Sequence, residues 1–159
     1  MEKSKFTLYE ISDILQHNAV LTMTDNIGKD YGTGDKYTPI EVHTIGYIAD
    51  HPHCTATDIA YEWGKTTGAV SQIIKKLRAY GMVTAVRNPQ DEKQILLNLT
   101  EKGVKLDRCH RAYDEQTLTL MFKTLRKSFT TEEIDTAFSV LKTYVEEYCR
   151  AKSDLKKKK

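Results

Sequence analysis

The chain has 159 residues, of which 40% are apolar, and a formal net charge of +2 at pH 7. That length fits one domain with an ordinary core, and no run of about 18 apolar residues marks a membrane span. The N-terminus lacks a basic-then-apolar leader pattern and the three cysteines are widely spaced, so we expect a cytoplasmic protein with reduced thiols.

Charge is distributed unevenly along the chain. Residues 1–63 contain 4 Lys and Arg against 10 Asp and Glu, whereas residues 64–94 contain 6 against 2 and residues 95–159 contain 14 against 10. Basic charge therefore gathers in the middle and C-terminal parts, as binding to a polyanion requires. Because the excess is modest, strong binding would need a pair of such sites.

The N-terminal third predicts two helices and a loop. A helix is expected from Phe6 to about Asn26, within segment 6–27, because apolar residues recur there at helical spacing. Residues 28–36 contain three glycines and four charges, which is typical of a loop. Thr38 as N-cap and Pro39 at the first helical position then begin a helix that ends before Pro52. Its apolar residues lie on two faces, so we expect it to sit between two layers.

Two short helices joined by a turn are predicted between Thr55 and Gly81. Thr55 and Asp58 form a capping pair for the first helix, and Gly64 ends it. The second helix has an apolar stripe at helical spacing and a glycine stop at Gly81. Its opposite face carries no acid and presents Gly68, Ser71, Gln72, Lys75 and Lys76. This helix-turn-helix has an outer face suited to a phosphate-lined groove.

A β-hairpin is predicted directly after the second short helix. Residues 82–87 and 94–99 favour strands, and the turn-forming segment 88–93 separates them. A hairpin that follows a helix-turn-helix is typical of a winged helix. The alternative is that the two helices and the hairpin merely form a core.

Two long helices are predicted after the hairpin. Thr100 caps the first, which reaches to about Lys127, and Thr130 with Glu133 forms a capping box for the second. Along the second helix, apolar residues alternate steps of four and three and form a ridge: Ile134, Phe138, Leu141, Val145 and Tyr148. Either the terminal helices dimerise through this ridge, or it packs against the chain's own first helix. The basic tail, residues 153–159, is expected to be solvated.

Short motifs over most of the chain occur in an order and at a spacing that match a known family. They are Asp58-Ile59-Ala60, Thr67-Gly68-Ala69-Val70-Ser71, Lys76-Leu77, Gly81-Met82-Val83, Arg87-Asn88-Pro89-x-Asp91 and Leu99-Thr100-Glu101-Lys102-Gly103. In these motifs the chain resembles the MarR family of bacterial transcription regulators. One departure is Glu92, which stands at the hairpin tip where the family usually has a basic residue.

The resemblance implies a mainly α-helical fold with a small β-hairpin wing, in which long N- and C-terminal dimerisation helices flank a winged helix-turn-helix core. It implies a single domain over residues 1–159, with a DNA-binding lobe at 38–99 and a dimerisation region at 6–27 and 100–152. It also implies a homodimeric regulator, a repressor, that binds a palindromic site in double-stranded DNA.

The expected DNA contacts lie on the second short helix and on the hairpin. Gln72 is the candidate for base recognition, because its amide can pair with adenine through two hydrogen bonds. The lysines and Arg87 are expected mainly at phosphates. The full set is Thr66, Thr67, Gly68, Ser71, Gln72, Lys75, Lys76, Arg87 and Lys93.

His110 and Asp114 suggest a metal site. They stand four apart on a predicted helix, so their side chains point the same way, and His43 with Asp25 can complete a mixed nitrogen and oxygen site. The zinc-dependent subgroup of the MarR family has metal ligands at the positions that these four residues match, with Glu in place of Asp25 and His in place of Asp114. The two aspartates leave iron or manganese open beside zinc. The alternative is a surface hydrogen bond between His110 and Asp114.

Other signals and other classes of protein remain open. No cofactor is required, but a small organic effector can bind where Tyr31, Tyr37 and Tyr47 line a cleft beside the DNA-binding lobe. Cys54 is either an oxidation sensor or a buried, inert thiol. The His and Asp residues also admit a metalloenzyme, and a winged helix can be a protein-interaction module. Because HExxH, nucleophile-elbow, phosphate-loop and dinucleotide motifs are lacking, we do not expect an enzyme.

Overall fold

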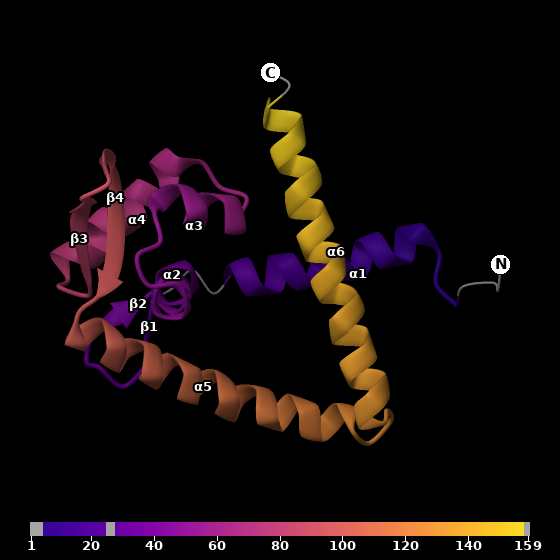
Figure 1. The fold of residues 1–159 in the computed structure, drawn as a ribbon. Coiled ribbons are helices and arrows are strands. Elements are labelled where there is room, and N and C mark those ends of the chain that lie inside the picture. The colour runs from indigo at the N-terminus through magenta and orange to yellow at the C-terminus, as the bar shows by residue number, and fades with distance from the viewer. Residues whose placement is uncertain (1–4, 25–27, 158–159) are drawn as a thin grey trace.

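The computed structural model describes residues 5–24 and 28–157, which form a winged-helix lobe and three long helices that extend from it (Figure 1). In chain order the elements are α1 (Leu8–Thr24), β1 (Lys29–Asp30), β2 (Lys36–Tyr37), α2 (Pro39–Asp50), α3 (Ala56–Glu62), α4 (Thr67–Ala79), β3 (Val83–Asn88), β4 (Asp91–Leu99), α5 (Glu101–Leu125) and α6 (Thr131–Lys157). This order confirms the mainly helical fold with a small β-hairpin. None of the helices, within the described part of the chain, is long and apolar enough to cross a membrane.

Helix α2 lies at the centre of the fold. The Thr38 N–H donates to Glu41 Oε2 over 2.8 Å, which completes the capping box at its first turn. The side chains of Val42, Ile45 and Ile48 are buried and join a core that includes Val70 and Leu77 of α4. On its other side α2 packs along α5. Helix α2 thus lies between the core of the lobe and α5, as the sequence predicted, but Gly46, Asp50 and His43 rather than a second apolar face make its hydrogen bonds and ring contact to α5.

The helix-turn-helix consists of α3 and α4, and local capping fixes where each helix begins and ends. Thr55 and Asp58 cap α3 reciprocally, and Gly64 leaves the helix at φ 56°. The Thr66 hydroxyl accepts the Ala69 N–H at the start of α4, and Gly81 turns the chain away at φ 69°. These contacts confirm the predicted positions of both helices.

The antiparallel hairpin β3–β4 is the wing, with Val83 opposite Leu99 and Arg87 opposite Ile95. Its turn is shorter than the predicted segment 88–93, because Asn88 and Asp91 pair across it. The Asn88 Oδ1 accepts the Gln90 N–H, and the Asp91 Oδ1 accepts the Lys93 N–H. Side-chain bonds of this kind tighten a turn, so the strands extend further than propensity alone indicated.

The segment 28–36, expected to be a loop, instead contains β1 and the first residue of β2, which pair antiparallel. The carboxylate of Asp30 organises the turn by accepting the backbone N–H groups of Gly32, Thr33 and Gly34 over 2.8, 2.9 and 3.1 Å. Gly32 and Gly34 have φ values of 88° and 84°, which favour glycine. Residues 31–35 thus form the predicted loop, whereas the sequence did not predict the short strand pairing at its two ends.

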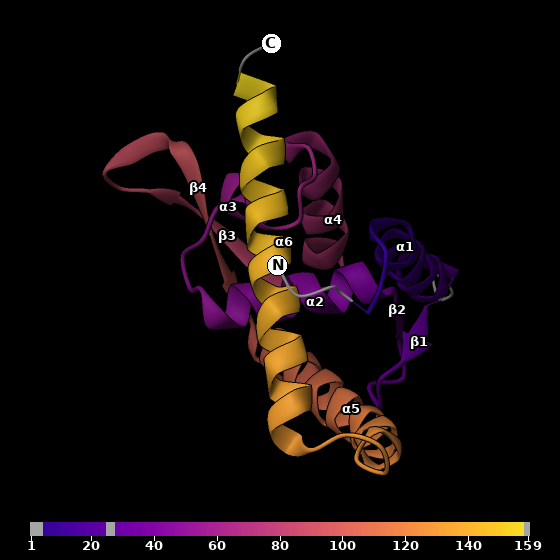
Figure 2. The same cartoon turned by 90° about the vertical axis from the view of Figure 1, so that its right-hand side faces the viewer.

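The long helices α5 and α6 lead away from the lobe and back toward it (Figures 1 and 2). Helix α5 begins where Thr100 accepts the Gly103 N–H, and a Cβ on Gly103 would collide with the Met82 carbonyl oxygen. Helix α6 begins with the Thr130 and Glu133 capping box and returns to contact α3. Figure 2 shows α1 well to one side of α6, so these two helices do not cover each other.

Candidate functional site

The outer face of α4 is exposed and contains no acidic residue. The exposed residues that begin or line this face are Thr66, Thr67, Gly68, Ser71, Gln72, Lys75 and Lys76. Val70, Ile74 and Leu77 on the opposite face are buried, which fixes the rotation of the helix. These residues are therefore exposed along one side of α4, although the ammonium of Lys76 reaches back to Glu41 on α2.

The wing adds two exposed cations, Arg87 and Lys93, to the surface beside this face. Asp91 and Glu92 are exposed at the same hairpin tip. The wing therefore presents a mixture of charges rather than a purely cationic tip.

Lys76 differs from the other cations of the candidate DNA-binding face because it has a buried partner. Its Nζ lies 2.5 Å from Glu41 Oε1 on α2, and the Glu41 side chain is only 5% exposed. The other carboxylate oxygen of Glu41, Oε2, accepts the Thr38 N–H. Although burial opposes it, the bond from Lys76 holds the pKa of Glu41 below its ordinary value, and Glu41 in turn raises the pKa of Lys76.

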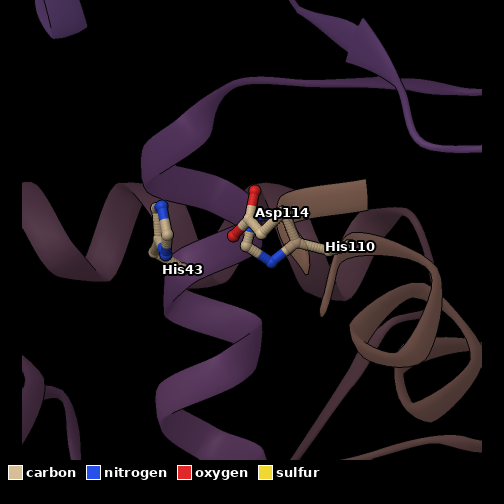
Figure 3. Close-up of side chains that lie close together, drawn as sticks. All are labelled: His43, His110 and Asp114. Carbon is tan, nitrogen blue, oxygen red and sulfur yellow. The ribbon is translucent and has the colours of Figure 1, made fainter. Parts of the chain in front are cut away.

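A second candidate site lies where α2 crosses α5 (Figure 3). His43 comes from α2, and His110 and Asp114 come from adjacent turns of α5. His110 Nε2 lies 3.1 Å from Asp114 Oδ2, and the two imidazole rings are 4.8 Å apart between centroids. One ligand atom from each residue lies within 4.8 Å of the others, so the fold brings together three of the four predicted ligands. Asp25, the fourth, lies outside the described residues.

The donor set of this cluster fits a divalent transition metal. Two imidazole nitrogens and one carboxylate oxygen are ligands typical of zinc, iron or manganese sites. Around a zinc ion such atoms lie roughly 3.3 Å apart, given bonds of about 2.0 Å, so only small side-chain rotations are needed. Burial lowers the pKa of His110, against the opposing effect of Asp114, which favours the neutral ring that can coordinate a metal.

Hydrogen-bonded ion pairs beside the candidate metal site join α2 to α5. The Arg111 Nε donates to both carboxylate oxygens of Asp107 over 3.0 and 2.9 Å, and its Nη2 donates to Asp50 on α2 over 2.9 Å. A cavity of about 330 Å³ lies beside these groups and is also lined by His43, Tyr47 and Trp63. The i,i+4 spacing of Asp107 and Arg111 was a sequence signal for the ion pair within α5, which the prediction from the sequence missed, whereas no local signal indicated the bond from Arg111 to Asp50.

The three tyrosines proposed for an organic effector have different surroundings. Tyr47 lines the cavity and stacks on His51, with ring centroids 4.3 Å apart. Tyr31 is buried with its ring edge-on to His110 at 5.1 Å, and Tyr37 is fully buried against Tyr80, with its hydroxyl bonded to Asp35. Tyr47 therefore lies beside a cavity, whereas Tyr31 and Tyr37 form packing contacts.

Cys54 is a buried thiol in contact with the core. It is 7% exposed and pairs by its backbone with Leu97 of the wing. Burial raises the pKa of its thiol to about 11. This environment is that of an inert cysteine rather than of an oxidation sensor.

Comparison with known proteins gives consistent matches. The MarR family model matches residues 36–94. The HTH-type transcriptional regulator YhjH of Bacillus subtilis is 28% identical over 105 residues, which cover 66% of this chain and 59% of YhjH. The transcriptional regulator ZitR of Lactococcus lactis subsp. cremoris is 29% identical over 113 residues, which cover 71% of this chain and 77% of ZitR.

Solved structures share the fold. The crystal structure of Lactococcus lactis ZitR, a zinc-responsive MarR family member, matches with a TM-score of 0.62 and 25% identity, over 88% of this chain and 97% of ZitR. Streptococcus pneumoniae FabT in complex with DNA matches with a TM-score of 0.66 and 24% identity, over 89% of this chain and 99% of FabT. The second match, below 25% identity, supports the fold alone.

We expect Cys54 to be protected from alkylation in the native protein. At pH 8 a pKa of about 11, instead of the ordinary 9.0, lowers the thiolate fraction about a hundredfold, and burial limits access further. Labelling with iodoacetamide, followed by mass spectrometry of the peptides, should therefore find Cys149 modified well before Cys54, and urea should remove the difference. Rapid labelling of native Cys54 at pH 8 would contradict this prediction and would support Cys54 as an oxidation sensor.

Proposed function

This chain belongs to the MarR family of transcriptional regulators, and from that premise we propose that it binds double-stranded DNA as a homodimer and represses transcription. Members of the family are regulators rather than enzymes, which agrees with the sequence-based expectation. In the proposal residues 38–99 form the DNA-binding lobe, and residues 6–27 with 100–152 form the dimerisation region.

The acid-free outer face of α4 is the observation that carries the proposal. A helix that presents small, polar and cationic side chains can enter the major groove, where Gln72 would contact a base and Lys75 a phosphate. Arg87 and Lys93 on the wing would add phosphate contacts. FabT, which shares the fold, is described in complex with DNA, and the proposal gives this lobe the same use.

Dimerisation is supported by apolar side chains that the single chain leaves exposed. Phe138, Leu141, Val145 and Tyr148 of the predicted ridge are between 38% and 57% exposed, whereas Ile134 is buried. Helix α1 lies to one side of α6 (Figure 2), which favours a second copy over α1 as the cover of the ridge. A second copy is the simplest cover, because it would bury the ridges of both chains. A dimer would present two α4 helices to major grooves one helical turn apart.

For the signal we propose a divalent metal ion held by His43, His110 and Asp114. The metal ion would replace the hydrogen bond between His110 and Asp114. Its three ligands would join α2 to α5. Because α2 belongs to the lobe and α5 leaves it, this joint would bias the placement of the lobe relative to the dimerisation helices. ZitR, described as zinc-responsive, supports this signal over an organic effector.

We expect Lys75→Ala and Arg87→Ala to weaken binding to every duplex, because both substitutions remove a cation aimed at phosphate. Each should also reduce the slope of log affinity against log salt by about 0.9 for every phosphate that is no longer neutralised. Gln72→Ala should instead lower the preference for the selected operator by about 1–3 kcal/mol, since it removes hydrogen bonds to a base. Fluorescence anisotropy across a salt series, with selected and random duplexes, measures all three effects.

Lys127→Ala is the matched control, because Lys127 is exposed in the turn after α5 and remote from α4. Its affinity and salt slope should equal those of the wild type. Wild-type values for both Lys75→Ala and Arg87→Ala would show that the assigned DNA face is wrong.

We expect the double substitution Leu141→Glu and Val145→Glu to convert the dimer into a monomer, because four buried carboxylates would oppose association of the two ridges. Light scattering after size-exclusion chromatography measures the mass. Thr143→Glu, on the opposite face of α6, is the control and should remain dimeric. A wild-type chain that is monomeric at every concentration would refute the proposed dimer.

We expect zinc or manganese to change the fluorescence of Trp63, the single tryptophan, because its ring lies 6.0 Å from that of His43. The same titration should change DNA affinity at matching metal concentrations. His43→Ala and Asp114→Asn should weaken both responses by more than about tenfold, since each removes a ligand.

His17→Ala is the control for the metal titration. His17 and Asp13 also form an i,i+4 pair of imidazole and carboxylate, but no third ligand residue joins them in the described part of the chain. This variant should respond as the wild type does. A full response in His43→Ala, or the same reduced response in His17→Ala, would place the metal elsewhere.

A further inference from the structure

We infer that Glu41 and Lys76 are positioning residues, which hold the recognition helix α4 against α2, and that Lys76 does not neutralise a DNA phosphate. The inference rests on the proposed DNA-binding function and changes the role that the sequence predicted for one residue. Lys75 and Lys76 are adjacent and both exposed in part, yet the structure gives them different surroundings.

Both oxygens of the Glu41 carboxylate are engaged. Oε1 lies 2.5 Å from Lys76 Nζ, and Oε2 accepts the Thr38 N–H over 2.8 Å. The Glu41 side chain is 5% exposed, so water does little to stabilise its charge. A buried carboxylate without its cation is left uncompensated, which opposes the release of Lys76 to a phosphate.

The Lys76 ammonium is also held from a second side. It lies 5.7 Å from the centroid of the Tyr80 ring, which in turn packs edge-on against the buried ring of Tyr37 at 5.8 Å. The Tyr80 carbonyl accepts a bond from Lys102 of α5 over 3.1 Å. The C-terminal end of α4 is therefore joined to α2, β2 and α5 through one contiguous set of contacts.

Lys75 is the natural comparison. It lies one residue earlier on the same helix, is exposed, and has no ion-pair partner among residues 5–24 and 28–157. A free cation releases counterions when it meets a phosphate, whereas a cation already neutralised by Glu41 contributes little to that release. The two lysines should therefore differ in the salt dependence of binding, although they are neighbours of the same charge.

The test measures DNA affinity across a salt series for Lys75→Met, Lys76→Met and Glu41→Gln in the full-length protein. Lys75→Met should reduce the salt slope by about 0.9 per neutralised phosphate and leave the ratio of operator to random affinity unchanged. Lys76→Met should leave the slope unchanged and reduce that ratio by about tenfold, because α4 no longer has its fixed orientation. Glu41→Gln keeps the cap acceptor and should reproduce the reduced ratio.

Two further variants separate positioning from general damage. Lys76→Arg retains the charge and should restore the operator preference of the wild type. The double variant Glu41→Gln with Lys76→Met should be no worse than either single variant, because the two residues act as one unit. A reduction of the salt slope in Lys76→Met equal to that in Lys75→Met would overturn the inference, as would wild-type operator preference in Glu41→Gln.

Hydrogen exchange distinguishes a failure of this inference from a failure of the proposed function. The amides of α4 should exchange faster in Lys76→Met and in Glu41→Gln than in Lys75→Met, without any DNA present. If the wild type bound no duplex but these rates differed as stated, only the proposed function would fail. Equal exchange in all three variants would overturn the positioning role itself.

Discussion

The burial of α2 between the winged-helix core and α5 is the constraint on which the rest of the structure depends. Val42, Ile45 and Ile48 are 0–1% exposed, and burying each side chain contributes about 1.5–3 kcal/mol. Helix α2 cannot shift without exposing part of this area, so its polar side chains keep fixed positions. Glu41 consequently points to α4, and His43 faces α5. One buried helix thus supports both the recognition helix and the candidate metal site.

The charge of the protein surface depends on which carboxylates are engaged in bonds within the fold. The N-terminal part of the chain is acidic, but several of its carboxylates are engaged within the fold: Asp30 in a turn, Glu41 and Asp58 at helix starts, and Asp50 on Arg111. A carboxylate that accepts backbone N–H groups is held at a helix start or turn, and of these four Glu41 meets α4 through its bond to Lys76. The acid-free face therefore stays available to a polyanion, although the net charge of the chain is only +2.

The candidate metal site joins the DNA-binding lobe to a helix of the proposed dimerisation region. His43 belongs to the lobe, whereas His110 and Asp114 belong to α5 (Figure 3), which leads away from the lobe to the helices of the proposed dimer interface (Figure 1). The bonds from Arg111 to Asp107 and Asp50 already join α2 and α5 one turn away. In our proposal the ion adds a second link between α2 and α5 beside the first. Two links restrict the angle between these helices more than one link does. Such a restriction can favour one spacing of the two recognition helices.

The sequence by itself determined the helices and the wing, because caps at Thr55, Thr66 and Thr100 and the spacing of apolar residues are local signals. It missed the strand pairing at the ends of segment 28–36, where three backbone N–H groups converge on Asp30, and it overestimated the length of the wing turn. Only the tertiary structure decided that His43 contacts His110, that Tyr31 and Tyr37 are packing residues, and that Lys76 forms an ion pair with Glu41. These pairings join residues dozens of positions apart, and no helical or strand period relates them. They depend on how α2, α4 and α5 pack, which is a property of the assembled core.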